Sequence, residues 1–317
     1  MYAILAQTGG LKCAFQVPIF QELVRERIPD LIVGNSGGAL NGVLASQGDL
    51  NLLEDLWLSV GELAPWRWQG NSWDIIERIK LILSSLVWRS RRGLYDLTEL
   101  RVCIDQMVSL KKLRTEFACG VVSRETSIYH NLVASSMKSD RELQEAVLAS
   151  SAIAGLFAPV DLVIDGKNHT CSDGGHLHTI PLIPKMFRDN VKEIDLIMTY
   201  PVVRQTRSSS EVNGMWRSME WALEIALTQA QIHGLRQIRH MAERGVRVRI
   251  FSPEIHLGGL LEGNDDIIQN RMRLGRKALE HPIIWDQSCG YMSEISTGMS
   301  MHSLGSISGP IKMKSQQ

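Results

Sequence analysis

The sequence lacks a surplus of charge of either sign, a long apolar run and any closely spaced pair of cysteines. Its 34 Lys and Arg residues balance its 34 Asp and Glu residues, so we expect no nucleic-acid partner on electrostatic grounds. No window approaches 18 uninterrupted apolar residues, so we expect no membrane-spanning helix. The N-terminus has neither the basic segment nor the apolar length of a secretory signal. We therefore expect a cytoplasmic protein that meets a membrane only at its surface.

Cysteine usage argues against a disulfide framework and against a zinc site. The cysteines are odd in number, widely spaced and form no CxxC pair; they are Cys13, Cys103, Cys119, Cys171 and Cys289. Reduced thiols fit a cytosolic setting best. We expect no metal ion and no organic cofactor.

The first fifty residues alternate between apolar runs and helical patterns. The runs 2–5 and 31–33 predict buried strands, each followed by a glycine-rich loop and then by a helix. Such alternation favours an α/β fold in which helices cover both faces of a mainly parallel sheet. Further strands are expected at 117–122, 127–132, 168–171, 194–199 and, as the last strand, 246–251, with helices at 140–150 and 215–243.

Composition divides the chain into segments. Residues 50–100 hold five of the eight tryptophans and an apolar helical pattern, and we interpret them as a helical cap inserted in a catalytic domain of residues 1–288. Residues 289–317 are rich in Ser, Gly and Met and are expected to form a loose tail. Within the cap, 66–92 combines four tryptophans with an apolar helical face and the basic cluster Arg89, Arg91 and Arg92, which suits transient contact with a membrane surface. Burial of these tryptophans inside the cap is the plainer interpretation.

The strongest local motif is Gly34-Asn35-Ser36-Gly37-Gly38, which fits the G-x-S-x-G nucleophile elbow and has a predicted strand before it and a helix after it. A serine on such a turn needs small neighbours. The turn is expected to lift the hydroxyl into solvent beside the free N–H groups of the helix. Ser36 is therefore the candidate nucleophile, and the N–H group of Gly37 is a candidate oxyanion donor. A glycine-rich turn that holds a phosphate is the alternative.

A second glycine-rich motif, Thr8-Gly9-Gly10-Leu11-Lys12, follows the first predicted strand. Gly9 and Gly10 allow backbone N–H groups to converge on one point, as an oxyanion hole requires, and each such donor stabilises a transition state by about 3 kcal/mol. A simple turn is the alternative. The full G-x-G-x-x-G dinucleotide pattern is absent from the motif. We expect Lys12 to be a solvated charge.

The third motif is Asp173-Gly174-Gly175, at the end of a predicted strand. A carboxylate in this position could take the proton of the serine hydroxyl directly, although Asp-Gly-Gly alone is a common structural turn. A catalytic triad would need a histidine, and the candidates are His176, His178, His233, His240 and His256. The α/β-hydrolase order of Ser, acid and His allows them, but that fold builds several strands before its elbow, and Ser36 comes too early.

Together the three motifs resemble those of the patatin-like phospholipase family, in the same order and at similar separations. The stretches 93–96 and 149–160 are similar to the family as well, so that the likeness covers roughly residues 2–200. The resemblance implies a three-layer α/β fold and a Ser36–Asp173 dyad without histidine. It also implies an oxyanion hole near Gly9, Gly10 and Gly37. The implied reaction is hydrolysis of lipid acyl esters, of phospholipase A or lysophospholipase type, through an acyl-enzyme and without a cofactor.

The chain departs from the family pattern in its oxyanion loop. Thr8 stands where the family usually has its first glycine, and Cys13 where it has its last; Ala154 replaces a usual proline. These changes raise the alternative of an inactive lipid-binding or signalling module, against which the intact Ser36 and Asp173 argue. An acyltransferase that uses the same nucleophile is a further alternative.

Overall fold

The computed structural model describes residues 1–63, 97–202 and 215–287. Within these residues nine strands form one sheet in the order β5-β6-β3-β2-β1-β7-β8-β9, with β4 paired to β3. The strands are β1 Tyr2–Ala6, β2 Leu31–Gly34, β3 Glu116–Ser123, β4 Tyr129–Val133, β5 Val160–Ile164, β6 Lys167–Asp173, β7 Glu193–Ile197, β8 Arg247–Phe251 and β9 Ile283–Trp285. The central strands β3, β2, β1, β7 and β8 are parallel, and the outer pairings are antiparallel.

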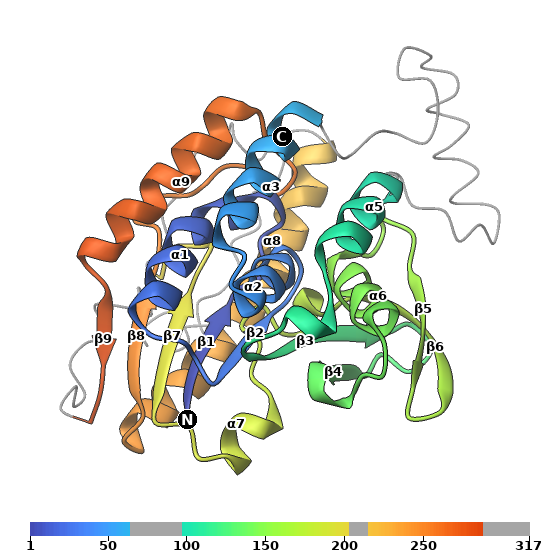
Figure 1. Cartoon of the computed structure of the whole chain (residues 1–317). Coiled ribbons are helices and arrows are strands. Elements are labelled where there is room, and N and C mark those ends of the chain that lie inside the picture. Colours follow the sequence, from blue (N-terminus) through green and yellow to red (C-terminus); the bar gives the residue numbers. More distant parts are fainter. Residues whose placement is uncertain (64–96, 203–214, 288–317) are drawn as a thin grey trace, which may run out of the picture.

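Helices cover both faces of this sheet (Figure 1). The α-helices are α1 Val17–Glu26, α2 Gly37–Gln47, α3 Leu50–Leu63, α5 Thr98–Met107, α6 Asp140–Ser151, α7 Pro184–Arg188, α8 Met215–Glu243 and α9 Asp265–Glu280; the 3-10 helices include η1 Gly10–Gln16 and η4 Gly174–His176. Helices α1, α2, α3 and α9 share one apolar core with the sheet, whereas α7 and α8 pack on the other face. The predicted three-layer α/β fold with a mainly parallel sheet is confirmed.

The prediction that 246–251 is the last strand is wrong. The chain continues into helix α9, whose buried side includes Ile268, Met272 and Gly275, and then into the short antiparallel edge strand β9. Helix α9 is hard to predict from the sequence because its buried side carries few apolar residues in a mostly polar segment. An edge strand of three residues is too short to show the alternation of apolar and polar residues that marks a strand.

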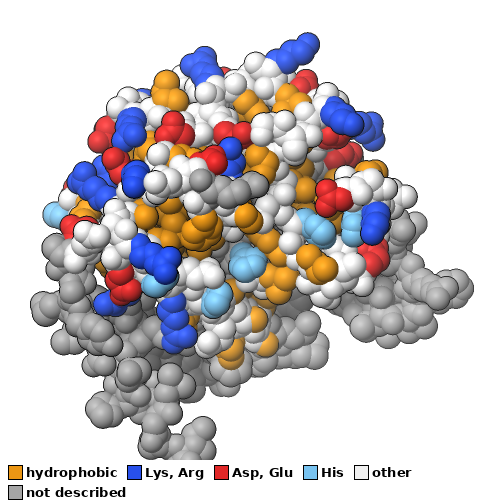
Figure 2. Space-filling model, turned by 90° about the horizontal axis from the view of Figure 1, so that it is seen from below, with side chains coloured by type: hydrophobic (Ala, Val, Ile, Leu, Met, Phe, Trp, Pro, Cys, Tyr) orange, Lys and Arg blue, Asp and Glu red, His pale blue; other side chains and the backbone are white. Residues whose placement is uncertain are grey.

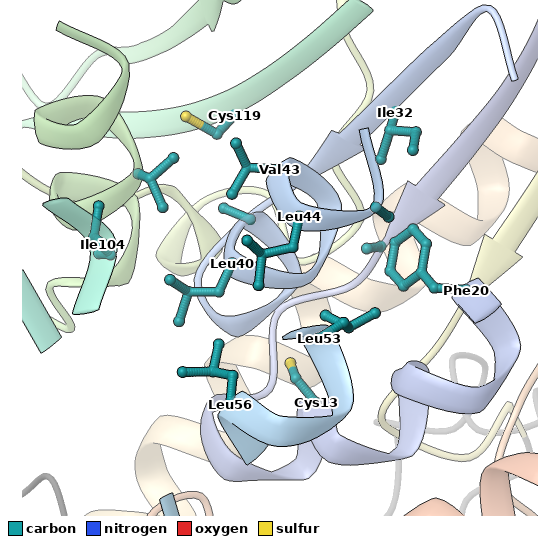
Figure 3. Close-up of a cluster of buried hydrophobic side chains, with 14 of the residues drawn as sticks. Cys13, Phe20, Ile32, Leu40, Val43, Leu44, Leu53, Leu56, Ile104 and Cys119 are labelled. Carbon is teal, nitrogen blue, oxygen red and sulfur yellow. The ribbon is translucent and has the colours of Figure 1, made fainter. Parts of the chain in front are cut away.

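Helix α2 supports the elbow rigidly because each residue of the helix is buried. Figure 3 shows the apolar side chains that surround it, which come from α1, α3, α5, β2 and β3; among them are Phe20, Ile32, Leu53, Leu56, Ile104 and Cys119. Burial of each large apolar side chain contributes about 1.5–3 kcal/mol. The N-terminus of α2 is thus fixed by packing on every side.

The first part of the expected cap belongs to this same core. Helix α3 contacts α1, α2 and α9, and the indole N–H of Trp57 donates to Asn41 Oδ1 at 2.6 Å. Residues 64–96, which contain most of the expected cap and the whole stretch 66–92, lie outside the described residues, as does the expected tail. Membrane contact through 66–92 therefore stays a prediction. No helix in the described part of the chain is both long and apolar enough to cross a membrane.

Candidate active site

Strands β2 and β6 meet end to end along one edge of β3. Strand β2 runs parallel to β3 and ends with Gly34 opposite Cys119, whereas β6 runs antiparallel and ends with Asp173 opposite Val121. Strand β4 pairs with β3 across both stretches, so β2 and β6 must share the other edge. Their ends face each other across Gly120. This topology brings the elbow motif and the Asp-Gly-Gly motif together, although they are far apart in the sequence.

Ser36 adopts the strained backbone conformation of a nucleophile elbow. Its φ is 59° and its ψ is −132°, a region that costs a non-glycine residue about 1–3 kcal/mol. It directly precedes α2, whose N-terminus carries the positive end of the helix dipole. Its own N–H group donates to Ser150 Oγ at 3.2 Å. The sharp turn therefore places the side chain of Ser36 at the positive end of a buried helix.

The side chain of Ser36 lies beside Asp173, close enough for a hydrogen bond from the hydroxyl to lower the pKa of that carboxyl. Asp173 Oδ1 also accepts the N–H group of Gly175 at 2.7 Å, and this bond fixes the carboxylate at the end of β6. Both residues are only 2% exposed. The expectation that the elbow lifts the serine into solvent is therefore wrong, because the residues around the turn close over it.

Burial raises the pKa of Asp173 above the ordinary carboxyl range. Desolvation of the carboxylate is the largest cause, since an ionised group loses hydration in the interior. A positive charge on His176 and the hydrogen bonds from Ser36 and Gly175 act in the opposite direction. A carboxylate with a raised pKa is a stronger base than a solvated one, which suits it to accept a hydroxyl proton.

Gly10 and Cys13 of the loop after β1 lie against Gly37 at the start of α2. A Cβ atom on Gly37 would be 2.8 Å from both the Cys13 Sγ atom and the Gly10 carbonyl oxygen, so only glycine fits there. Gly37 is the first residue of α2, and its N–H group has no acceptor within the helix. Within the described residues, the N–H groups of Gly9, Gly10 and Gly37 have no hydrogen-bond acceptor. They are thus available to a ligand oxygen.

The two departures from the family's loop pattern fill space that glycine would leave. The side chain of Thr8 packs on Gly175, where a Cβ atom would lie 2.4 Å from Thr8 Oγ1. The thiol of Cys13 donates to the carbonyl oxygen of Gln7 at 3.7 Å, and burial raises its pKa. Both residues therefore tie the loop to its surroundings, and Thr8 links it directly to the Asp-Gly-Gly motif.

The side chain of Asn35 holds the elbow and the aspartate loop together, a role that the sequence interpretation missed. Its Oδ1 atom accepts the N–H group of Gly120 at 2.8 Å, and its Nδ2 atom donates to the carbonyl oxygen of His178 at 2.7 Å. It also exchanges a hydrogen bond of 3.1–3.2 Å with the Tyr129 hydroxyl. Gly120 lies in the gap between β2 and β6, so the Asn35 amide replaces the backbone acceptor that neither strand supplies.

Lys12 is fully buried, and the expectation of a solvated charge is wrong. Its ammonium nitrogen lies 3.4 Å from Glu224 Oε1 and 3.4 Å from His256 Nε2, and 4.1 Å from the centre of the Tyr200 ring. All three partners lie at residue 200 or later, far from Lys12 in the sequence. Sequence spacing gives no sign of contacts over such separations, whereas an ammonium can be buried only where it has such partners.

Two histidines near Ser36 and Asp173 contact neighbouring groups. His176 Nδ1 lies 3.0 Å from the backbone carbonyl oxygen of Asp173, and the ring of His178 packs edge-on against Tyr129. The described residues contain no group of three or more His, Cys, Asp and Glu side chains that could hold a metal ion.

A cavity of about 150 Å³ lies at the opposite end of the sheet, where β1, β7 and β8 begin. Figure 2 is a view from below onto this side and shows basic and acidic side chains close together. In its wall, Asp195 accepts the Tyr2 hydroxyl at 2.6 Å and two N–H groups of Arg249 at 2.7 Å each. This charge-balanced network cross-links three strands. It lies away from Ser36.

A family model matches the part of the chain that carries the three motifs. The sequence model of the patatin-like phospholipase family matches residues 7–185, which is more than half of the 317-residue chain. Among solved structures, VipD from Legionella pneumophila aligns with 90% of this chain and 68% of its own, at 11% sequence identity and a TM-score of 0.42. No curated protein sequence gives a match. The matched range contains all five candidate site residues and ends before α8, β8 and α9.

Proposed function

The chain belongs to the patatin-like phospholipase family, whose members are usually lipid acyl hydrolases, and from this premise we propose that Ser36 and Asp173 are its catalytic dyad. The proposed reaction releases fatty acids from lipid acyl esters, of phospholipase A or lysophospholipase type. The observation that carries the proposal is the buried position of the Asp173 carboxylate beside the Ser36 side chain, at the end of the strand that meets the elbow.

The reaction proceeds in two steps. Asp173 accepts the hydroxyl proton while Ser36 Oγ attacks the ester carbonyl, and the negative charge moves to the carbonyl oxygen. N–H groups of Gly9, Gly10 and Gly37 would hold that oxyanion, together with the dipole of α2. The proton then passes to the leaving alcohol as the ester bond breaks. Water releases the fatty acid from Ser36 in the second step, with Asp173 again accepting and returning a proton.

The test is hydrolysis of p-nitrophenyl esters by Ser36→Ala and Asp173→Asn. Each variant should lose roughly 10³-fold or more in kcat/KM, and the double variant should be little worse, because the two residues act as a unit. Ser135→Ala is the matched control, since this serine is exposed and should retain full activity. A Ser36→Ala protein that hydrolyses the esters at the wild-type rate would refute the proposed dyad.

Product analysis separates hydrolysis from the alternatives. The wild-type protein is incubated with mixed-chain phospholipids, with and without a lysophospholipid acceptor, and every acyl product is identified. Free fatty acid that depends on Ser36 supports hydrolysis. Transfer of the acyl chain to the acceptor identifies an acyltransferase with the same nucleophile. Binding of lipid without acyl release, in the presence of intact Ser36, identifies an inactive lipid-binding module.

A further inference from the structure

The loop that follows β8 lies against the oxyanion loop and comes from outside the range that the family model matches. The carbonyl oxygen of Leu260 accepts the N–H group of Leu11 at 2.9 Å. Gly10 has a φ of +52°, and a Cβ atom on it would lie 2.5 Å from the same carbonyl oxygen. Since the Gly10 carbonyl in turn lies close to Gly37, Gly10 contacts the elbow helix with one group and the distant loop with another.

One buried side chain organises that distant loop. Arg271 of α9 is 1% exposed and donates to three backbone carbonyl oxygens: to Leu257 at 2.9 Å, to Glu262 at 2.6 Å and to Gly259 at 3.2 Å. These acceptors lie on both sides of Leu260. The planar fork of a guanidinium can hold three acceptors in fixed directions, which a lysine cannot do. The position of the Leu260 carbonyl is therefore set by Arg271.

A second anchor lies at the start of the same loop. His256 Nδ1 accepts the N–H group of Gly258 at 3.1 Å, and its other ring nitrogen lies 3.4 Å from the Lys12 ammonium. Glu224 of α8 lies 3.4 Å from both Lys12 and His256. The oxyanion loop is thus held at Gly10 and Leu11 through the loop carbonyl, and at Lys12 through a cluster of charged side chains.

Burial lowers the pKa of Arg271 to about 10, so the guanidinium keeps its positive charge at neutral pH. Burial is the largest cause that raises the pKa of the Cys13 thiol, which lies beside Gly37; the charge of Asp173 raises this pKa further, whereas the charges of Arg271 and Lys12 lower it. The two cations are therefore close enough to the site for their field to reach it. In a water-poor interior such a field favours negative charge on a reacting oxygen.

We propose that Arg271 is a positioning residue for the oxyanion hole, which it fixes through the loop 257–262 with support from His256. This proposal rests on the proposed Ser36–Asp173 hydrolase. Arg271 touches neither substrate nor reacting atoms; it acts by holding the Leu260 carbonyl against Gly10 and Leu11. Misplacement of an oxyanion donor by about 1 Å costs on the order of 10²-fold in rate.

The experiment compares Arg271→Lys with Arg273→Lys. Arg273 lies on the exposed side of the same helix and donates to Asn270, so its replacement should change neither rate nor stability. Arg271→Lys should lower kcat for a soluble short-chain ester by about 10- to 100-fold and leave KM within about twofold, as expected when only transition-state interactions are lost. Inhibition by a trifluoromethyl ketone, which forms a tetrahedral oxyanion on Ser36, should weaken by the same factor as kcat/KM.

A second pair of variants covers the case in which Arg271→Lys does not fold. His256 is partly exposed, so His256→Ala should fold and should lower kcat by several-fold. His256→Asn keeps a side-chain acceptor for the Gly258 N–H group and should recover most of that loss. Wild-type kcat and inhibitor affinity in a folded Arg271→Lys, or in His256→Ala if the former does not fold, overturn the proposal. Absence of Ser36-dependent hydrolysis in the wild-type protein instead refutes the proposed function.

Discussion

Replacement of Asn35 by alanine tests how Ser36 and Asp173, the proposed dyad, are kept aligned. The amide of Asn35 occupies the gap between the ends of β2 and β6, where it serves the Gly120 N–H group, the His178 carbonyl oxygen and the Tyr129 hydroxyl. Asn35 is completely buried, so water cannot take the place of the amide without rearrangement. Asn35→Ala therefore separates the elbow from the loop that carries Asp173.

The expected loss of stability follows from the number of hydrogen bonds that the substitution breaks. Each buried hydrogen bond contributes about 1 kcal/mol net, and a buried donor left without an acceptor costs about 1–3 kcal/mol. Loss of the bonds to Gly120 and His178, with the Gly120 N–H group left unsatisfied, should lower the free energy of unfolding by about 3–5 kcal/mol. Tyr129→Phe removes only the hydroxyl group that contacts the Asn35 amide and should lower the free energy of unfolding by about 1 kcal/mol.

Urea unfolding and ester hydrolysis are measured on the same preparations. Activity of Asn35→Ala should fall by about 10²-fold under conditions in which the protein is folded, because the serine and the carboxylate are no longer aligned. Asn168→Ala, in an exposed position on β6, should change the free energy of unfolding by less than about 0.5 kcal/mol. An Asn35→Ala protein within about 1 kcal/mol of the wild type, or one as active as the wild type, would contradict this account.

Two further predictions concern the raised pKa of Asp173. Because the folded-state pKa lies above the unfolded-state value, ionisation of Asp173 lowers stability as the pH rises through the folded-state pKa. Asp173→Asn should therefore raise the melting temperature at neutral pH while it abolishes activity, and the difference should shrink at low pH; a lower melting temperature at neutral pH would show that burial of the carboxylate is not costly. His176→Gln should keep more than about a tenth of the activity. In the pH profile of kcat/KM, the loss of activity at low pH should begin at a higher pH than in the wild type, because a charge that lowers the pKa of Asp173 is removed. An unchanged pH profile would show that His176 does not act on the carboxylate.

The fold and the candidate residues could be predicted because their signals are local. A strand followed by a glycine-rich turn and a helix is visible within a short stretch of sequence, and the glycines mark places where the backbone must come close to another segment. Gly37 is such a place, because a side chain there would collide with Cys13. The alternation of strands and helices likewise predicts the parallel sheet without knowledge of any long-range contact.

The parts that could not be predicted depend on contacts between distant segments. Asn35 is simply the variable position of its motif, and its role follows only from the gap at Gly120 that the strand register creates. Arg271 stands in a polar helix among other arginines, and nothing in the sequence marks it as the buried one. Lys12 was expected in solvent because its partners, Glu224 and His256, lie more than 200 residues further along the chain.

Because Ser36 and Asp173 are buried, the proposed chemistry of the site depends on the part of the chain after residue 185, where the family match ends. Burial makes Asp173 a stronger base, yet it also requires the loops around the site to stay closed against the cost of a buried charge. Several contacts that hold the oxyanion loop closed come after residue 185. Thr199 Oγ1 donates to the Thr8 carbonyl oxygen at 2.5 Å, Leu260 accepts from Leu11, and Glu224 pairs with Lys12. Residues 7–185 alone would leave the Lys12 ammonium without its carboxylate partner and Gly10 without its support. The catalytic motifs and the C-terminal third must therefore fold as one unit for the site to keep its geometry.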